Sequence, residues 1–253
     1  SIADIQKQFH HLIRMIPGNG LVIAPKTDNQ ITQVLDKGCW SPVQFVGSDW
    51  KVENCSADGS EFDVIYKGKS FGRVKWPLLG QHNVQNAMMA IIAARHAGVL
   101  PEVAIEALGS FVNAKRRMEI LGTVNGITVY DDFAHHPTAI ATTLEGLRAK
   151  VGDARILAVL EPRSNTMKMG VHKQTLAKSW SAADQVFIYE PSNLSWSMDA
   201  LLAQSEVTAL LHNDLNILEK SILSYVKPGD HVLIMSNGGF GGIHQRLLQK
   251  LSQ

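Results

Sequence analysis

The segment Ile156-Leu157-Ala158-Val159-Leu160-Glu161-Pro162-Arg163-Ser164-Asn165 decides the fold class. Five consecutive apolar residues predict a strand that is buried on both faces, as strands of parallel sheets are. Polar residues follow at once and place a loop at the carboxyl end of that strand. Because a helix is expected over residues 173–182, the segment opens a strand–loop–helix unit.

The same unit recurs on both sides of this segment. Further strands are expected over 127–130, 186–189, 207–211 and 231–235, and further helices over 137–150, 198–203, 215–226 and 243–251. The pair Asn125-Gly126 predicts a hairpin that joins a strand over 120–124 to the strand over 127–130. The alternation indicates an α/β fold in which residues 115–253 form a Rossmann-like, doubly wound and mostly parallel sheet.

Residues 1–114 show a different pattern. Short strands are expected over 21–24, 43–46, 51–55, 62–66 and 71–76, and helices over 31–35, 82–96 and 101–108. Polar and glycine-containing turns separate the strands from residue 43 onward, which predicts a meander. We therefore expect two α/β domains, 1–114 and 115–253, with a boundary near residues 114–117.

The composition narrows the class of protein. The 253 residues include 24 basic and 23 acidic side chains, for a net charge of +1, which gives no electrostatic footprint for nucleic acid or an anionic membrane. Two cysteines make neither a metal cluster nor a disulfide framework. No apolar run is long enough to span a bilayer, and residues 1–10 do not resemble a signal peptide. We expect a cytoplasmic protein.

Polar clusters follow most of the predicted strands of the second half. In an open parallel sheet, ligands bind beyond the carboxyl ends of the strands. The clusters are Asp131–His136, Glu161–Asn165, Glu190 and Ser236–Gly239. Their common placement predicts a functional site at this edge of the sheet.

The first of these clusters has two interpretations. Asp131 and Asp132 can accept hydrogen bonds from both hydroxyls of a ribose, or an aspartate there can cap the following helix. His135 and His136 stand just before Pro137, near the positive end of a helix, where they can donate hydrogen bonds to phosphate oxygens. For a single aspartate we favour the cap, and His136 can equally belong to a solvated loop. For the eight residues 131–138 as a unit we favour function.

Two further groups can serve a nucleotide. Arg116 and Arg117 follow Lys115 at the expected domain boundary, where arginine can clamp phosphate or simply decorate the surface. The side chains that share one face at the start of a predicted helix are His82, Asn83 and Asn86. Asparagine can bind the edge of adenine, but His82 and Asn83 can also cap the helix.

The loop after the strand at 156–160 suits an acidic substrate. Arg163 and Lys168 supply two cations, and Ser164 and Asn165 supply hydrogen-bonding groups, which fits a substrate with several carboxylates. The alternative is a solvated charged loop.

The glycine-rich segment 236–242 does not indicate a dinucleotide site. Its spacing is not that of G-x-G-x-x-G, and it follows the last strand rather than the first, which argues against NAD. A P-loop motif is also absent from the sequence.

Taken together, these segments resemble the Mur ligase family of ATP-dependent amide-bond ligases. Residues 80–86 resemble the central-domain motif whose helix contacts adenine. Arg116-Arg117 resembles the interdomain arginine that contacts the phosphates of ATP. Residues 131–138 resemble the opening of the C-terminal domain, where an aspartate holds the ribose and a histidine lies near the γ-phosphate.

Residues 161–170 and 236–244 resemble the branch that joins L-Ala-γ-D-Glu-meso-diaminopimelate to UDP-N-acetylmuramic acid in peptidoglycan recycling, through an acyl phosphate. The resemblance implies a central ATP-binding domain whose P-loop part is missing from residues 1–114. It also implies ATP and Mg²⁺ as cofactors, with the main metal ligands in the missing N-terminal part, so that the fragment alone is expected to be inactive.

The resemblance also implies roles for individual residues. It assigns the nucleotide to His82, Asn83, Asn86, Arg116, Arg117, Asp131, Asp132 and His135, with Arg117 and His135 acting on phosphate. Strand-end position and the charge of the substrate lead us to expect the tripeptide at Arg163, Ser164, Asn165, Lys168, Ser236 and Asn237. Two alternatives remain open, namely the ligase that adds L-alanine and a non-catalytic module that binds nucleotide and peptide.

Overall fold

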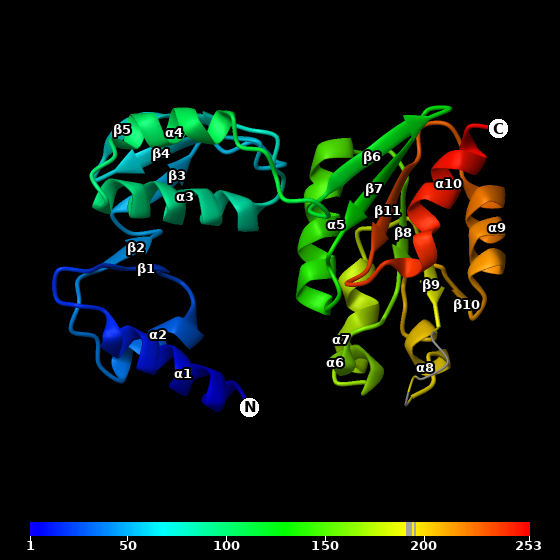
Figure 1. Cartoon of the computed structure of the whole chain (residues 1–253), viewed down its shortest axis with the longest axis horizontal. Coiled ribbons are helices and arrows are strands. Elements are labelled where there is room, and N and C mark those ends of the chain that lie inside the picture. Colours follow the sequence, from blue (N-terminus) through cyan, green and yellow to red (C-terminus); the bar gives the residue numbers. More distant parts are fainter. Residues whose placement is uncertain (191–193, 195) are drawn as a thin grey trace. The chain divides into compact units, whose positions relative to one another are not determined.

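The computed structural model describes residues 1–190, 194 and 196–253, which form two compact units (Figure 1). Unit 1 is Ser1–Val112 and unit 2 is Asn113–Gln253, so the division falls close to the boundary expected near residue 114. Within the described residues, no helix combines the length and the apolar character needed to cross a bilayer.

Unit 2 contains a sheet in the order β10-β9-β8-β11-β7-β6. The strands are β6 (Glu119–Val124), β7 (Ile127–Asp132), β8 (Ile156–Leu160), β9 (Gln185–Tyr189), β10 (Ala209–His212) and β11 (His231–Met235). Every pair of neighbours is parallel except β6 and β7. Asn125 and Gly126 join those two with φ values of 51° and 77°, as a type I′ turn requires. The prediction of a mostly parallel sheet is confirmed.

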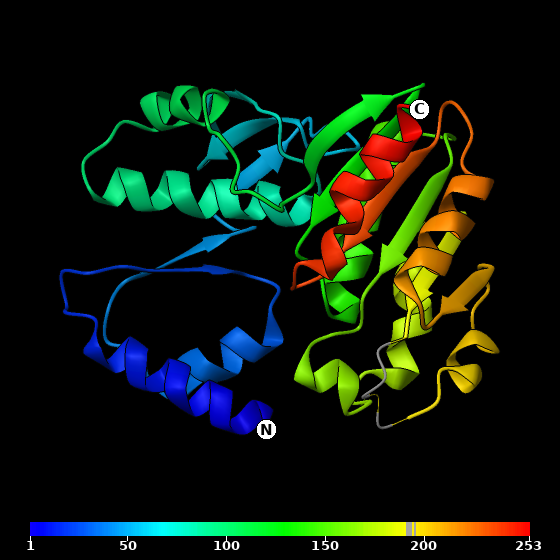
Figure 2. The same ribbon diagram turned by 45° about the vertical axis from the view of Figure 1, so that its right-hand side comes forward.

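Helices cover both faces of this sheet (Figure 2). α5 (Pro137–Val151) packs on one face, whereas α9 (Leu215–Tyr225) and α10 (Ile243–Leu251) pack on the other. Strand β8 shows why, because Ile156 and Ala158 belong to the core under α5 while Leu157 and Val159 belong to the opposite core. A strand that is apolar at every position needs two covered faces, and the doubly wound arrangement provides them.

Two local expectations in unit 2 need correction. The helix expected over 173–182 is α7 (Lys173–Leu176) followed by the 3₁₀ helix η1 (Ala177–Trp180). The hydroxyl of Ser179 donates to the carbonyl of Leu176 at 2.6 Å, a local bond that competes with regular helix geometry. The loop expected after β8 contains the helical turn α6 (Asn165–Lys168). Farther along the chain lies α8 (Asp199–Leu202).

Unit 1 contains a sheet in the order β1-β2-β3-β4-β5. The strands are β1 (Val22–Pro25), β2 (Val43–Val46), β3 (Trp50–Glu53), β4 (Glu61–Tyr66) and β5 (Lys69–Lys75). The predicted meander is confirmed for β3, β4 and β5, which are antiparallel, but β2 pairs in parallel with β1 and touches β3 through one parallel pair, Val46 and Trp50. The N–H of Gly47 donates to the carbonyl of Trp50 at 2.7 Å, and the chain does not reverse there.

Four helices are described in unit 1: α1 (Ile2–Met15), α2 (Asn29–Asp36), α3 (Gln81–His96) and α4 (Pro101–Gly109). Met88 and Ile91 of α3 are fully buried with Trp50, Phe62 and Val74 of the sheet. This packing fixes the helix whose first turns carry the predicted adenine-binding residues.

Candidate functional site

The carboxyl ends of β7, β8 and β11 lie next to one another. β11 runs between the other two strands, so that Met235 pairs with Asp132 on one side and with Leu160 on the other. The polar groups that follow these three strands are therefore neighbours. Three of the clusters that the sequence placed at one edge of the sheet do meet there.

Arg116 ties two of these strand ends together. Its Nε lies 3.2 Å from Oδ2 of Asp131, and its Nη2 donates to the carbonyls of Ser236 at 2.5 Å and Gly238 at 2.8 Å. The backbone of Arg116 has a φ of 61°, a left-handed conformation that is uncommon for a residue with a side chain. These contacts give Arg116 an internal structural role in addition to any contact with phosphate.

His244 joins the same network, and the sequence alone gave it no role. His244 lies in the first turn of α10, and its Nε2 lies 3.2 Å from Oδ1 of Asp131. Both residues are buried, with exposed fractions of 9% for His244 and 7% for Asp131. Burial lowers the pKa of His244, although the charge of Asp131 opposes the shift, so the ring is neutral at pH 7. Its place in the first turn after a glycine run was the only signal in the sequence.

Asp132 is buried, with 3% of its surface exposed, and protein groups occupy both of its carboxylate oxygens. Oδ2 accepts the N–H of Met118 at 2.8 Å, while Oδ1 accepts the N–H of Ala134 at 2.7 Å and the hydroxyl of Thr143 at 3.4 Å. None of these donors is an N–H group of α5, whose N-cap is His136 without a side-chain hydrogen bond, so Asp132 does not cap that helix. Burial raises the pKa of its carboxyl, although the hydrogen bonds oppose the shift.

This raised pKa predicts how Asp132→Asn behaves with pH. Between the ordinary and the raised pKa, the folded chain binds more protons than the unfolded chain, so stability from this group is present below its ordinary pKa and is lost as pH rises through the raised pKa. We therefore compare the free energy of unfolding of the wild type with that of D132N. The wild-type value minus the D132N value should fall as the pH rises from about 4 toward 7. Urea unfolding across a pH series measures it, and a difference that grows with pH would contradict the raised pKa.

Glu161 and Ser236 form the third part of the network. The hydroxyl of Ser236 donates to Oε2 of Glu161 and accepts the N–H of Gly238 at 2.9 Å. Ser236 has no exposed surface and supports the loop here, and the predicted contact between its side chain and a substrate stays a prediction. Glu161 was recognised in the sequence as following a strand but received no role.

The predicted phosphate-binding groups lie on the outside of this network. The guanidinium of Arg117 is exposed and lies 5.9 Å from the ring centroid of Phe133. His135 is half-buried, and its Nδ1 lies 2.8 Å from the carbonyl of Phe133. His136 is exposed, yet partial burial, followed by the charges of His135 and His172, lowers its pKa.

The predicted tripeptide-binding groups surround the ends of β8 and β11. Arg163 and Asn165 are exposed and Lys168 is half-buried, while the hydroxyl of Ser164 accepts the N–H of Met167 at 3.4 Å as the N-cap of α6. Asn237 is half-buried, and its Oδ1 is buried without a hydrogen-bond partner among the described residues. A buried acceptor without a protein partner is costly.

The predicted adenine-binding residues lie in unit 1, at the start of α3. The amide of Asn83 donates to the carbonyl of Leu79 at 2.7 Å, but this bond is not the predicted helix cap, because the N-cap of α3 is Gly80 and has no side-chain hydrogen bond. His82 and Asn86 are exposed, and the amide of Asn86 donates to Oδ1 of Asn83 at 3.4 Å. Contact with adenine therefore stays a prediction for His82 and Asn86, whereas Asn83 has a structural partner.

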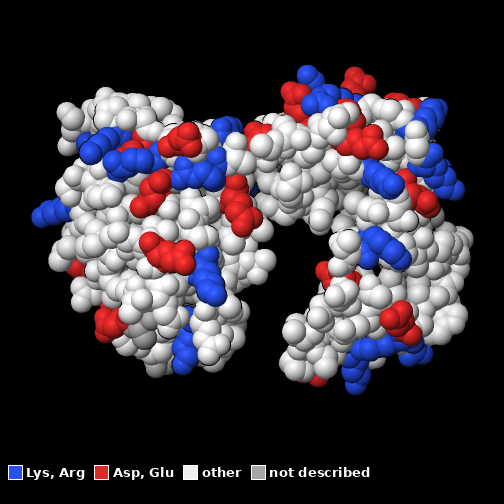
Figure 3. All heavy atoms as spheres, turned by 180° about the vertical axis from the view of Figure 1, so that it is seen from behind, with Lys and Arg blue, Asp and Glu red and all other residues white. Residues whose placement is uncertain are grey.

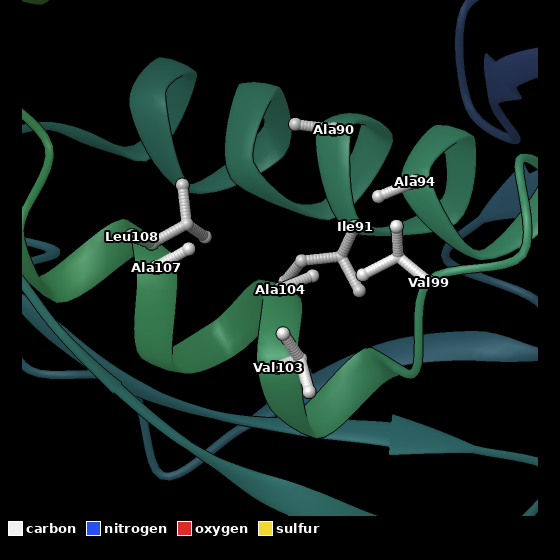
Figure 4. Close-up of a pocket in the computed structure, with 8 residues that line it drawn as sticks. All are labelled: Ala90, Ile91, Ala94, Val99, Val103, Ala104, Ala107 and Leu108. Atoms are coloured by element: carbon white, nitrogen blue, oxygen red, sulfur yellow. The ribbon is translucent and has the colours of Figure 1, made fainter.

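Two other features do not compete with this site. A cavity of about 230 Å³ between α3 and α4 is lined only by Ala90, Ile91, Ala94, Val99, Val103, Ala104, Ala107 and Leu108 (Figure 4). A lining without polar groups cannot orient a phosphate or a peptide carboxylate. On the face drawn in Figure 3, acidic and basic side chains are interspersed, in keeping with the net charge of +1.

Two family models match the chain. Residues 116–238 match the model described as the Mur ligase glutamate ligase domain, and residues 1–94 match the Mur ligase middle domain. The UDP-N-acetylmuramate–L-alanyl-γ-D-glutamyl-meso-2,6-diaminoheptandioate ligase of Escherichia coli (strain K12) is 51% identical over 252 residues, which are 98% of this chain and 55% of that protein.

A solved structure gives the same picture. The murein peptide ligase of Psychrobacter arcticus 273-4 is 44% identical and superposes with a TM-score of 0.74, over 100% of this chain and 55% of that one. The UDP-N-acetylmuramate–L-alanine ligase of Caldanaerobacter subterraneus subsp. tengcongensis is 28% identical over 99% of this chain and 57% of that protein. The chain thus spans about half the length of the curated relatives that it matches.

Proposed function

Because the chain belongs to the Mur ligase family, we propose that it is part of an ATP-dependent ligase that joins L-Ala-γ-D-Glu-meso-diaminopimelate to UDP-N-acetylmuramic acid. The observation that carries this proposal is the 51% identity to a ligase named for that tripeptide, against 28% to one named for L-alanine. Both comparisons cover nearly the whole chain, so the difference does not arise from a short shared motif.

In the proposed reaction, ATP activates the carboxylate of UDP-N-acetylmuramic acid, and the amine of the tripeptide displaces phosphate. The residues of this chain act by positioning and by balancing charge. Arg117 and His135 are proposed to hold phosphate oxygens, since both reach solvent beside the buried Asp131 and Asp132. The network of Arg116, Asp131 and His244 holds the end of β7 in place beneath them.

The acceptor is proposed to bind at the ends of β8 and β11. Arg163 and Lys168 offer positive charge to the carboxylates of the tripeptide. Asn237, which is half-buried beside them, is proposed to contact the tripeptide through the exposed part of its side chain. L-Alanine, with one carboxylate, cannot use both cations, and the two acceptors are expected to be distinguished there.

We propose ATP as the nucleotide, together with Mg²⁺ bound outside this chain. Among the described residues, no group of three or more His, Cys, Asp or Glu side chains could hold a metal ion. No step is assigned to residues of this chain through the metal.

The test uses the protein expressed from the start codon of the gene that encodes this chain. ATP-dependent joining to UDP-N-acetylmuramic acid is assayed with the tripeptide and, separately, with L-alanine as acceptor. We expect turnover with the tripeptide as acceptor and none with L-alanine. Arg163→Ala should raise the KM for the tripeptide by roughly 10- to 100-fold and leave the KM for ATP unchanged, because it removes one charged partner of the acceptor.

Other results would contradict the proposal in distinct ways. Preference for L-alanine would assign the protein to the ligase that adds that amino acid. Saturable chemical-shift changes in NMR spectra of this chain on addition of tripeptide, with no turnover by the expressed protein, would indicate a binding module instead.

A further inference from the structure

The loops that follow β8 and β11 are fastened together at their bases. The N–H of Glu161 donates to the carbonyl of Met235 at 3.1 Å, and the hydroxyl of Ser236 donates to the carboxylate of Glu161. The N–H of Gly238 donates to the hydroxyl of Ser236 at 2.9 Å, and its carbonyl accepts from Arg116 at 2.8 Å. The peptide groups on both sides of the Gly238 Cα are thus held by buried neighbours.

The side chain of Arg163 lies against Gly238. A Cβ atom added to Gly238 would lie 2.8 Å from Cδ and 2.6 Å from Cζ of Arg163, and closer still to Nη1. Real Cβ atoms essentially never approach other heavy atoms so closely. The space that a side chain at position 238 would occupy is therefore filled by the guanidinium of Arg163.

The backbone does not need glycine at position 238. Neither Gly238 nor Gly239 is among the glycines with positive φ, whereas Gly241 and Gly242, at 57° and 70°, are. A Cβ atom at Gly239 would meet nothing within 4 Å. Alanine at 238 and alanine at 239 are thus matched changes, because both suit the backbone and only the first collides with Arg163.

We propose that Gly238 is a positioning residue for the acceptor site, because its missing side chain lets the Arg163 guanidinium rest on the loop after β11. The cation is then held at one place for a carboxylate of the acceptor instead of moving freely in solvent. This inference rests on the proposed function, in which Arg163 binds the tripeptide. Since Arg163 is exposed and flexible, a methyl group at 238 would displace it without disturbing the buried network beneath.

The test compares Gly238→Ala, Gly239→Ala, Arg163→Ala and the G238A/R163A double variant in the expressed protein. G238A should raise the KM for the tripeptide roughly tenfold or more, with kcat and the KM for ATP within about twofold of wild type. For G239A, kcat and both KM values should stay within about twofold of wild type. In the R163A background, G238A should raise the KM for the tripeptide by less than about twofold more. In NMR spectra of this chain, the Nε–H signal that R163A removes should shift in G238A but not in G239A.

The outcomes separate this inference from the proposed function. If R163A raises the KM for the tripeptide but G238A behaves like G239A, Gly238 does not position Arg163. A G238A effect that persists in full in the R163A background would likewise overturn the inference. If R163A itself leaves the KM unchanged, the proposed acceptor role of Arg163 fails, and this inference fails with it, whatever the NMR signal shows.

Discussion

Arg116→Met should lower the free energy of unfolding of unit 2 by about 3–5 kcal/mol, whereas Arg117→Met should lower it by less than about 1 kcal/mol. Removing the guanidinium of Arg116 leaves Asp131, which is 7% exposed, with a neutral histidine as its remaining partner. It also leaves the carbonyls of Ser236 and Gly238 without their donor. Arg117 is exposed over the face of Phe133 and acts on the buried Asp132 through its charge without a hydrogen bond, so a smaller loss is expected.

Because the two units need not unfold together, the measurement must report on unit 2 alone. Urea unfolding followed through backbone NMR signals of β7 and β11 meets this need. Arg117→Met serves as the matched control, since it removes the same type of side chain one residue away. Equal losses for the two variants would show that the bonds of Arg116 do not stabilise the end of β7.

The second large effect is expected at Glu219 of α9, which packs on the face of the sheet opposite α5. Glu219 has no exposed surface, and Nε of Arg246 lies 2.6 Å from its Oε2, in an ion pair without hydrogen-bond geometry, while Lys250 bonds its Oε1. The double variant R246A/K250A leaves this carboxylate buried without a cation. We expect a loss of about 3 kcal/mol, the lower end of the usual range, because water can enter the space that the two side chains leave.

Adding Glu219→Gln to that double variant should recover more than half of the loss. The change keeps the shape of the side chain and removes the charge, so the recovery measures the cost of an unpaired buried carboxylate. The same NMR-detected unfolding reports it through signals of α9. If the triple variant were no more stable than the double variant, lost packing of Arg246 and Lys250 would be the cause instead.

The adjacent arginines show a limit of prediction from sequence. Both offered the same chemistry at the expected boundary, and nothing in their order indicated which would be buried. The backbone of Arg116 is left-handed, with a φ of 61°. The side chain of Arg116 contacts residues 131, 236 and 238, and these contacts distinguish it from Arg117. Such distant contacts are invisible to a reading of local sequence.

Asp132 illustrates a second limit. A helix cap and a ribose ligand call for the same carboxylate at the same place, so the sequence supported both. In the structure the carboxylate is buried and accepts from three protein donors, two of them backbone groups outside α5, so it does not cap the helix, and the ribose contact stays a prediction. By contrast, the strand-end rule correctly brought together the clusters after β7, β8 and β11, three of the four it grouped, because it depends only on the direction of parallel strands.

Periodicity predicted most strands but not how they pair. The strands β2, β8 and β11 have the predicted bounds, because runs of apolar residues mark them clearly. The direction of pairing in unit 1 was wrong for β2 and β3, because the predicted meander makes them antiparallel and their one pair is parallel. Alternation of side chains is the same in parallel and antiparallel strands, so the error has a physical reason.

The position of β11 has a consequence for how the chain is made. The final strand lies in the middle of the sheet, between β7 and β8, which do not pair with each other. During synthesis, β7 and β8 leave the ribosome long before the strand that must join them. Their facing edges then stay open, and unpaired edges invite association with other chains. Completion of unit 2 therefore has to wait until β11 (His231–Met235) has been synthesised.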